Sequence, residues 1–328
     1  MGELLGPLDD QIIIWIQTFS PLFDFIFGLV TLFGDELVVV LIIGFLFFCI
    51  DKKIAIRSAF LVVITYFFTI LLKGYFGLQR PYIVNSAEIK GIPDLLGQLP
   101  DDYTFPSGHS SNVGAFWSYL ASKCRHRSFW VLAILMIIII PISRVYLGVH
   151  WPTDIIIGVF LGVLVSLIFI FLLPKVEGFI DKANPIFLAF MAIIIPIMGV
   201  IVSYLLILSM GNQIEYADPS PMGGLFVGLS IGAMLEHRFV NLKVKEYREN
   251  KKVLVYRAVL GLIVILGTYL SMSVIFGLLF EEWPLKQISR FCRYAILAFV
   301  GIFCLPWLFV FIEQKLSLEP NIPKKMIL

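Results

Sequence analysis

Residues 143–174 read SRVYLGVHWPTDIIIGVFLGVLVSLIFIFLLP. The part from 152 to 174 is apolar, with Asp154 as its one charged residue, and it has about the 20 residues that a helix needs to cross a bilayer. Arg144 and His150 stand just before this apolar run. The stretch therefore predicts a transmembrane helix with ionisable side chains at one end, and both features recur along the chain.

The composition of the whole chain also indicates a membrane protein. Hydrophobic residues make up 59% of the 328 residues and charged residues 15%, with a mean hydropathy of +0.94, whereas about a quarter of the residues in a soluble domain are charged. The net charge of +2 is too small to favour nucleic acid as a partner. The four cysteines have neither the pattern of a disulfide framework nor metal-type spacing.

Apolar stretches of near-spanning length predict an all-α fold, a polytopic bundle of about nine transmembrane helices. The segment from Ile12 to Leu32 is apolar but is broken by Ser20-Pro21 and Asp24, so we expect an interfacial or short re-entrant helix there. The predicted spans are 34–50, 58–78, 106–122, 129–147, 152–174, 185–209, 222–240, 253–280 and 287–314.

The spans and motifs divide the chain into three parts. Residues 1–33 are expected to form an N-terminal interfacial segment, residues 34–184 a core that carries all of the ionisable motifs, and residues 185–328 a C-terminal transmembrane extension. The chemistry of the protein is therefore expected in the core.

Loop charges predict which side of the membrane the motifs face. Basic residues fall in alternate loops, which the positive-inside rule places in the cytoplasm, and the intervening loops are richer in acidic residues. The motifs share the acidic side, so we expect an integral protein of the cell membrane whose site faces away from the cytoplasm. If the segment before Asp35 crosses the bilayer, every side is reversed. The basic residues are Lys52, Lys53, Arg57, Lys123, Arg125, Arg127, Lys175, Lys182, Lys243, Lys245, Arg248, Lys251, Lys252, Lys324 and Lys325, and the acidic ones are Glu88, Asp94, Asp101, Asp102, Glu215, Asp218, Glu281 and Glu282.

Three short motifs hold the ionisable residues of the core. They are K-x6-R-P at 73–81, P-S-G-H at 106–109 and S-R-x5-H-x3-D at 143–154. Pro106 suits the first turn of a helix, which would leave the next three amides free at a positive helix end. Such an end binds phosphate.

His150 and Asp154 have the spacing of a nucleophile and its orienting acid. Asp154 lies in the first turn of the predicted span, four residues after the histidine and within reach of its ring. A carboxylate there can hold one ring N–H and leave the other nitrogen with a free lone pair. Positive charge that matches the three non-bridging oxygens of a phosphoryl group is supplied by Lys73, Arg80 and Arg144.

Each of these residues also has a plainer interpretation. A histidine near a membrane interface, a snorkelling lysine or arginine, and a first-turn acid are all common without catalysis. These separate explanations predict neither the order nor the spacing nor the common side of the motifs, so the combination favours a site that handles a phosphoryl group. His126 and His237 lie in or beside basic loops and are assigned no role.

Together the motifs resemble the signature of the type 2 phosphatidic acid phosphatase superfamily, which includes lipid phosphate phosphatases, glucose-6-phosphatase and the vanadium haloperoxidases. The match covers residues 73–154 with no motif position substituted. The resemblance implies a six-helix-type core and hydrolysis that needs no metal or other cofactor. It also implies that His150 attacks phosphorus, Asp154 orients it and His109 protonates the leaving oxygen. The residues implied to hold the phosphate are Lys73, Arg80, Ser107, Gly108 and Arg144.

The chain after about residue 185 is an addition to such a core. Nine spans with an outside N-terminus and a cytoplasmic C-terminus resemble, in layout only, the glucose-6-phosphatase and sphingosine-1-phosphate phosphatase branch. Glycines between 223 and 232 form a small-residue stripe at helical spacing, which suits packing within the monomer more than a homodimer interface. Glu236 is expected to pair with Arg238 or another nearby base.

A site at the outer rim of a membrane bundle could reach a lipid headgroup while the lipid tails stay in the bilayer. We therefore expect a phosphatase of a phosphate monoester or pyrophosphate on phosphatidate, a polyprenyl chain or a sphingoid base. The alternatives are a sugar phosphatase like glucose-6-phosphatase, a lipid phosphotransferase, a haloperoxidase and a lipid transporter. The transporter is disfavoured because the polar residues collect at one rim. The loop from Tyr82 to Tyr103 is expected to cover the pocket and touch lipid.

Overall fold

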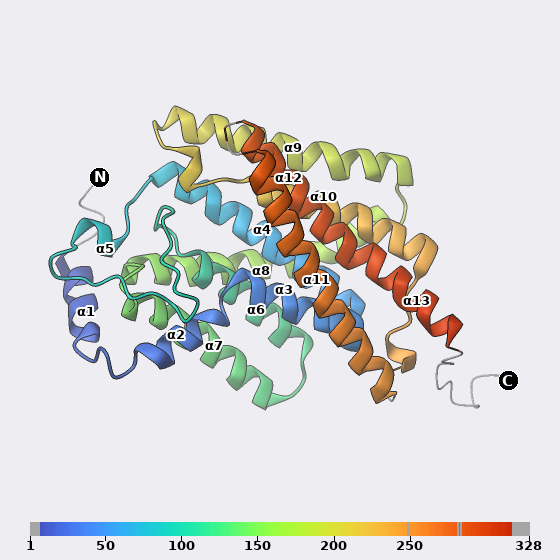
Figure 1. Ribbon diagram of the computed structural model, residues 1–328, viewed down its shortest axis with the longest axis horizontal. Coiled ribbons are helices and arrows are strands. Elements are labelled where there is room, and N and C mark those ends of the chain that lie inside the picture. Colours follow the sequence, from blue (N-terminus) through green and yellow to red (C-terminus); the bar gives the residue numbers. More distant parts are fainter. Residues whose placement is uncertain (1–6, 248–249, 281, 283, 317–328) are drawn as a thin grey trace. The chain divides into compact units, whose positions relative to one another are not determined.

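The structure is a computed structural model that describes residues 7–247, 250–280, 282 and 284–316. In these residues the regular secondary structure is helical, without strands, which confirms the predicted all-α class. Four charged residues of the loop pattern, Arg248, Glu281, Lys324 and Lys325, lie outside the described residues. The elements in chain order are α1 (Pro7–Gln17), α2 (Asp24–Leu32), α3 (Glu36–Phe45), η1 (Leu46–Ile50), α4 (Lys52–Phe76), α5 (Pro81–Val84), α6 (Gly108–Lys123), α7 (Arg127–Tyr146), α8 (Pro152–Ile180), α9 (Pro185–Ser209), η2 (Ile214–Tyr216), α10 (Ser220–Leu235), η3 (Glu236–Val240), η4 (Lys245–Tyr247), α11 (Lys251–Leu279), α12 (Leu285–Phe299), η5 (Val300–Cys304) and α13 (Leu305–Lys315) (Figure 1).

Each of the nine predicted spans corresponds to a helical stretch, but not all of these stretches have spanning length. Among the described residues, six helices are long and apolar enough to cross a membrane. A seventh candidate is formed by α2 with α3 and η1, which are bent by 50° at the break between them. In contrast, α6 and α10 have 16 residues each, which is short for a bilayer crossing. The fold is polytopic as predicted, and the count of nine spans stays a prediction.

The described residues form two compact units, and the chain passes between them several times. All of the motif residues belong to unit 1, so the candidate site is contained in one unit. The division into 1–33, 34–184 and 185–328 stays a prediction. Unit 1 comprises the described residues of Met1–Val39, Leu61–Lys182 and Ile201–Pro219, and unit 2 comprises those of Val40–Phe60, Ala183–Val200 and Ser220–Leu328.

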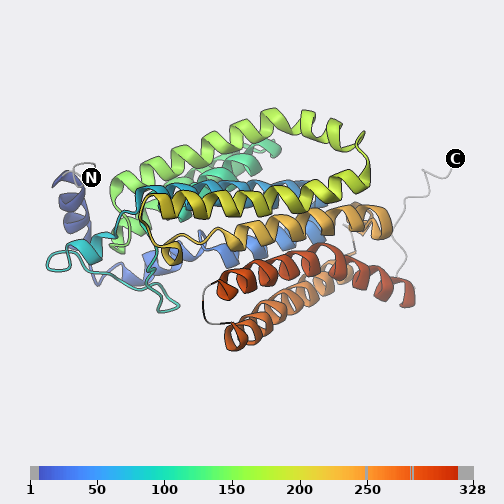
Figure 2. The same ribbon diagram turned by 90° about the horizontal axis from the view of Figure 1, so that it is seen from above.

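In unit 1, α6, α7 and α8 pack against one another, and glycines bring α6 and α8 into close contact (Figures 1 and 2). A Cβ atom added to Gly158 would lie 2.8 Å from the carbonyl oxygen of Ser107, and one added to Gly162 would overlap the carbonyl oxygen of Ser111. Small residues at such positions let helix backbones approach closely in a membrane. The contact joins the N-terminal ends of the two helices, where the Ser107 amide donates to the Asp154 carbonyl oxygen at 3.2 Å.

In unit 2, the glycine stripe of α10 packs on α12 (Figure 2). A Cβ atom on Gly224 would overlap the carbonyl oxygen of Phe291, and one on Gly228 would overlap that of Ala295. The stripe is therefore used for packing within the chain, which is the interpretation that the sequence favoured.

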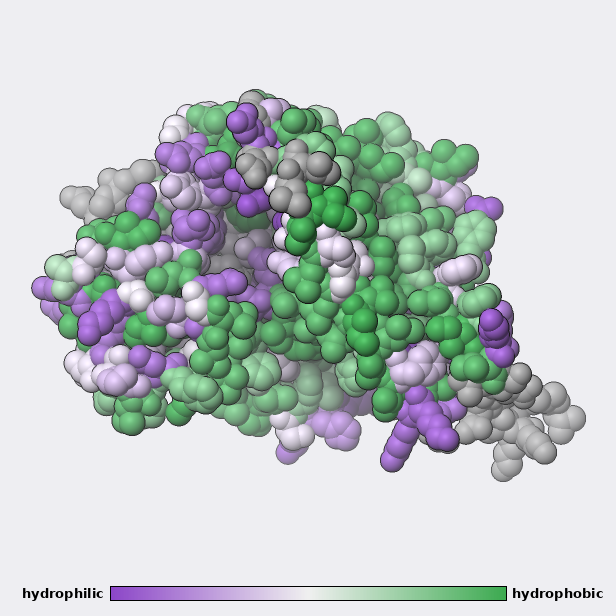
Figure 3. Space-filling model, viewed as in Figure 1, coloured by the Kyte–Doolittle hydropathy of each residue, from purple (hydrophilic) through white to green (hydrophobic). Residues whose placement is uncertain are grey.

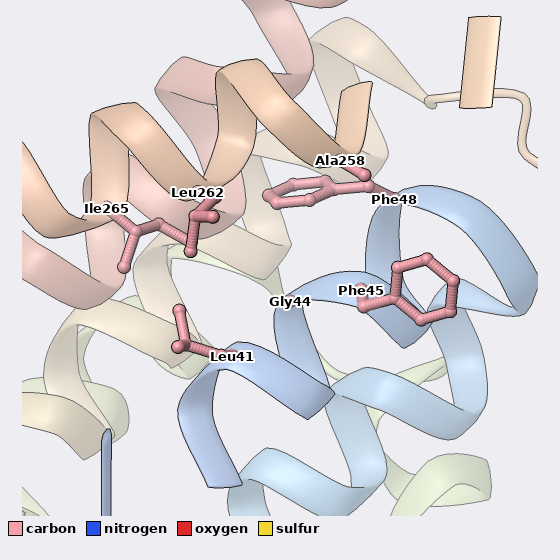
Figure 4. Close-up of a pocket in the computed structure, with 7 residues that line it drawn as sticks. All are labelled: Leu41, Gly44, Phe45, Phe48, Ala258, Leu262 and Ile265. Atoms are coloured by element: carbon pink, nitrogen blue, oxygen red, sulfur yellow. The ribbon is translucent and has the colours of Figure 1, made fainter. Parts of the chain in front are cut away.

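In the described part of unit 2, two buried carboxylates form ion pairs, and apolar side chains line a cavity. Glu236 accepts a hydrogen bond from Nζ of Lys52 at 3.0 Å, so the nearby base is Lys52 rather than Arg238. Arg257 donates to Glu313 from Nε at 2.8 Å and from Nη2 at 2.9 Å. Figure 4 shows the cavity, whose volume is about 180 Å³ and whose lining is Leu41, Gly44, Phe45, Phe48, Ala258, Leu262 and Ile265.

Large apolar side chains are exposed along the outer face of α8. Ile156, Phe160, Leu167 and Phe171 are each more than half exposed. A contiguous apolar surface of this kind is rare on soluble proteins, and lipid tails would cover it. In the space-filling view, by contrast, hydrophilic residues gather in the region of α5 and the segment that follows it (Figure 3).

We predict that Gly162→Leu lowers the free energy of unfolding by about 1–3 kcal/mol, because the new side chain would push α8 away from the main chain of α6. Thermal unfolding of the purified protein in detergent measures the change. Gly178→Leu is the matched control, since a Cβ atom at this position of the same helix meets nothing within 4 Å. Equal stability of the two variants would contradict the close contact between α6 and α8.

Candidate active site

The three motifs meet at one end of unit 1 (Figure 1). Lys73 lies in the last turn of α4, Arg80 directly precedes α5, Arg144 lies in the last turn of α7, and His150 lies just before α8. Each of these four residues is at most 5% exposed. Burial of cations costs free energy unless anions or hydrogen-bond acceptors compensate it. The partners of these cations therefore decide what the site can do.

Ser107, and not Pro106, lies at the N-terminal end of α6. The helix begins at Gly108, and the Ser107 hydroxyl oxygen accepts from the Ser110 amide at 3.4 Å, as an N-cap serine does. The prediction that Pro106 lies in the first turn is therefore wrong, because this capping contact starts the helix two residues later. The Ser107 amide is not free either, since it donates to a carbonyl oxygen of α8. The amides of Gly108 and His109 are the first of the helix, where an N–H has no partner within the helix.

His150 is held on one side by a carboxylate and a hydroxyl. Its Nδ1 lies 3.2 Å from Oδ2 of Asp154 and 3.0 Å from Oγ1 of Thr104. The same Asp154 oxygen accepts from the Trp151 amide at 2.9 Å and from the Thr104 hydroxyl. Since the hydroxyl donates its proton to Asp154, it can only accept from His150. This arrangement places the ring proton on Nδ1 and leaves Nε2 with a lone pair.

The surroundings of His150 also favour its neutral form. Burial, and then the positive charges of Arg80 and Arg144, lower the pKa of His150 well below its ordinary value. The imidazole is therefore uncharged at neutral pH, as a nucleophile requires. The motif pattern predicts His150 and Asp154 but not Thr104, because a threonine 46 positions before the histidine carries no signal in the sequence.

Arg80 places a positive charge beside His150. Its Nη1 donates to the carbonyl oxygen of Val149 at 2.7 Å and lies 3.2 Å from Nε2 of His150. Its backbone is extended, with φ −74° and ψ 151°, which is the conformation that a residue before proline prefers. The guanidinium therefore lies beside the nitrogen that would attack, where a transferred phosphoryl group needs positive charge.

Asp102 is a member of the site that the sequence does not predict. One of its carboxylate oxygens pairs with Lys73, the other pairs with Arg80, and its carbonyl oxygen accepts from Nε of Arg80 at 2.8 Å. Burial alone would raise the pKa of Asp102, but the charges of Lys73 and Arg80 hold it well below its usual range. In the sequence Asp102 is one of several acids in a loop, and only its position four residues before Pro106 sets it apart.

Arg144 and His109 are contacted by α2 and by a residue just after it. Nη1 of Arg144 donates to the hydroxyl of Thr31 in α2 at 2.7 Å, while its Nε has no hydrogen-bond partner in the described part of the chain. Gly34 lies against the ring of His109, because an added Cβ atom would be 3.1 Å from Cδ2. The segment predicted to be interfacial thus contacts the site through Thr31, and Gly34, at the start of the first predicted span, contacts it as well. Neither residue carries a motif signal.

All eight predicted site residues therefore lie in unit 1, and the structure adds Thr31, Asp102 and Thr104 to them. His109 is partly buried in the first turn of α6. Across the residues that the structure describes, no group of three or more His, Cys, Asp or Glu side chains is arranged to hold a metal ion.

Two family descriptions match this sequence. Residues 54–177 match the PAP2 superfamily, and residues 221–317 match the transmembrane extension of the PAP2 superfamily phosphatases. The first range contains all three motifs, and the second lies within the C-terminal addition.

Curated relatives of the chain are phosphatases named for lipid substrates. The undecaprenyl-diphosphatase of Sulfolobus acidocaldarius is 43% identical over 74 residues, which are 22% of this chain and 34% of that protein. Phosphatidylglycerophosphatase B of Bacillus subtilis is 35% identical over 89 residues, 24% of this chain and 40% of that protein. The lipid A 4'-phosphatase of Bacteroides thetaiotaomicron is 24% identical over 199 residues, 57% of this chain and 86% of that protein. No solved structure is a significant match.

The chain thus spans well under two thirds of the length of the first two of these relatives. The matched family range nevertheless contains every predicted site residue, and a second range matches the extension that accompanies this family. From these matches, and from the three motifs that meet in unit 1, the chain belongs to the PAP2 superfamily.

Proposed function

We propose that this protein is a metal-independent membrane phosphatase that hydrolyses a phosphate monoester or pyrophosphate through a phosphohistidine intermediate. The observation that carries the proposal is the orientation of His150, whose Nδ1 faces Asp154 and whose Nε2 faces Arg80. A neutral imidazole with Nε2 beside buried cations is placed to attack an electrophile that carries negative charge. A phosphoryl group is such an electrophile.

The reaction would proceed in two displacement steps. In the first, Nε2 of His150 attacks phosphorus, the bond to the leaving oxygen breaks, and protonated His109 gives that oxygen its proton. Asp154 stabilises the positive charge that develops on the imidazole. In the second, water gives a proton to His109 and attacks phosphorus, and the N–P bond breaks to release inorganic phosphate. The charge on the phosphoryl oxygens would be balanced in both steps by Lys73, Arg80 and Arg144.

A lipid is the substrate class that the observations support best. The relatives are named for undecaprenyl diphosphate, phosphatidylglycerophosphate and lipid A phosphatase activities. Between Arg80 and Asp102 the chain exposes four large apolar side chains, which lipid could contact. They are Ile83, Val84, Leu95 and Leu96, which are 46, 63, 42 and 60% exposed.

Two other activities would use the same site. A sugar phosphatase would release phosphate from glucose-6-phosphate as readily as from a lipid phosphate. A phosphotransferase would pass the phosphoryl group from His150 to a lipid, so its dephosphorylated donor would accumulate only when an acceptor is present. Phosphate release from a panel of purified lipid and sugar phosphates distinguishes both activities from the proposed one.

We predict that His150→Ala lowers phosphate release by about a thousandfold or more, because the attacking nitrogen is lost. Wild-type protein quenched during turnover should carry acid-labile phosphate on His150, which mass spectrometry of peptides can locate. His126→Ala is the matched control, since His126 is exposed and distant from the motifs in the sequence. Full activity of the His150 variant, or phosphate on another residue, would refute the assignment.

His109 has a different expected signature. If it protonates the leaving oxygen, His109→Gln should slow phosphorylation by lipid phosphates by about 10²–10⁴-fold. The loss with p-nitrophenyl phosphate should be much smaller, because this leaving group departs without a proton. Burst-phase kinetics measure the phosphorylation step for both substrates. Equal losses would show that His109 does not act as the acid.

The side of the membrane that the site faces is part of the proposal, and we expect the non-cytoplasmic side. In a protein without Cys49, Cys124, Cys292 and Cys304, Ser86→Cys should react with an impermeant maleimide in intact cells. Ser128→Cys should not react, although Ser128 is also exposed in the structure. The reverse pattern would move the site to the cytoplasm and would mean that the segment before Asp35 crosses the bilayer.

A further inference from the structure

Asp102 lies where the proposed mechanism needs a phosphate. Its Oδ2 pairs with Nζ of Lys73, and its Oδ1 pairs with Nη2 of Arg80. The same guanidinium lies 3.2 Å from Nε2 of His150 through its Nη1. The carboxylate therefore shares a guanidinium with the attacking nitrogen, and it takes up two of the three cations assigned to the substrate.

The exposed fractions of these side chains indicate which of them can move out of the ion pairs. The side chains of Lys73 and Arg80 are 4% and 2% exposed, whereas that of Asp102 is 32% exposed. An anion that arrives from solvent would meet Asp102 before it reaches the cations. Arg80 is also held by the carbonyl oxygen of Val149 at 2.7 Å, so it would keep its position if the carboxylate left.

A carboxylate and a phosphate can replace one another at this position. Both accept paired hydrogen bonds from a guanidinium, and both attract an ammonium group. A buried cation that loses its anion becomes strongly destabilising. In an empty site without Asp102, Lys73 and Arg80 would be buried cations without an anion. Some anion therefore has to be present whenever the substrate is absent.

We propose that Asp102 is an internal anion that neutralises Lys73 and Arg80 in the empty site and that the substrate phosphoryl group displaces in each catalytic cycle. This inference rests on the proposed function, because that function assigns the two cations to the substrate. Displacement requires only that one partly exposed side chain turns toward solvent. Only molecules in which Asp102 has left the two cations can then bind phosphate. The apparent affinity of any phosphate ligand is therefore reduced in proportion to the fraction of such molecules. Product phosphate is affected in the same way, so Asp102 promotes product release.

The test measures binding of inorganic phosphate to purified protein, without turnover. Asp102→Asn should lower the dissociation constant of radiolabelled phosphate about tenfold, which corresponds to about 1.4 kcal/mol. Asp101→Asn is the matched control, since it removes the same charge from the adjacent, exposed residue of the same loop. Asp102→Glu keeps a carboxylate on a longer side chain and should bind phosphate with nearly the wild-type affinity.

Thermal unfolding gives a second, independent measurement. Without phosphate, Asp102→Asn should unfold at a lower temperature than the wild-type protein, and saturating phosphate should raise its unfolding temperature by more than it raises the wild-type value. If folded Asp102→Asn protein can be purified only in phosphate buffer, this supports the proposal. Failure to fold even with phosphate overturns it, because Asp102 would then have a role that phosphate cannot replace.

The result that overturns the exchange is phosphate binding by Asp102→Asn that is equal to or weaker than wild-type binding. A different result would show that the proposed function is wrong. In that case no phosphate ester is hydrolysed by the wild-type protein, although Asp102→Asn still binds phosphate more tightly than the wild-type protein does.

Discussion

The burial of Lys73, Arg80 and Arg144 at the end of an apolar helical unit is the constraint on which the site depends. Each cation needs a compensating group, and these groups come from three parts of unit 1, with Asp102 shared by Lys73 and Arg80. Lys73 pairs with Asp102, Arg80 adds the Val149 carbonyl oxygen, and Arg144 bonds to Thr31. The loop before α6, the connection between α7 and α8, and the N-terminal segment are thereby tied to one point. A phosphoryl group entering this point would meet positive charge that the fold has already placed, which is the main requirement of phosphoryl transfer.

Close packing of α6 on α8 positions His109, His150 and Asp154 relative to one another. The glycines of α8 allow the two helices to approach until the Ser107 amide reaches the Asp154 carbonyl oxygen at 3.2 Å. One helix then presents its first amides and His109, and the other presents Asp154 to His150. Larger side chains in this contact would separate the proposed acid from the proposed nucleophile without touching either of them. The packing of the helices and the chemistry of the site therefore depend on the same few small residues.

Unit 2 holds its charges differently. Lys52 pairs with Glu236, and Arg257 pairs with Glu313, so the buried carboxylates are matched by bases of the same unit. Its cavity is lined by apolar side chains and a glycine, and its glycine stripe is covered by α12. None of the motif residues belongs to it. These features suit a packed membrane extension more than a second chemical site, in agreement with the family range that matches residues 221–317.

The sequence by itself determined the all-α polytopic class, the helical stretches and the residues of the three motifs, because apolar length and short-range spacing are local properties of the chain. It also determined the pairing of His150 with Asp154, since four residues across a helix start bring the two side chains together. Asp102, Thr104 and Thr31 were decided only by the tertiary structure, which brings them to cations and a histidine far away in the sequence. The start of α6 after Pro106 was decided in the same way, because Ser107 contacts both its own helix and the carbonyl oxygen of Asp154. The role of a polar loop residue depends on the charged group that folding places beside it. Because that group is far away in the sequence, a local sequence pattern cannot predict the role.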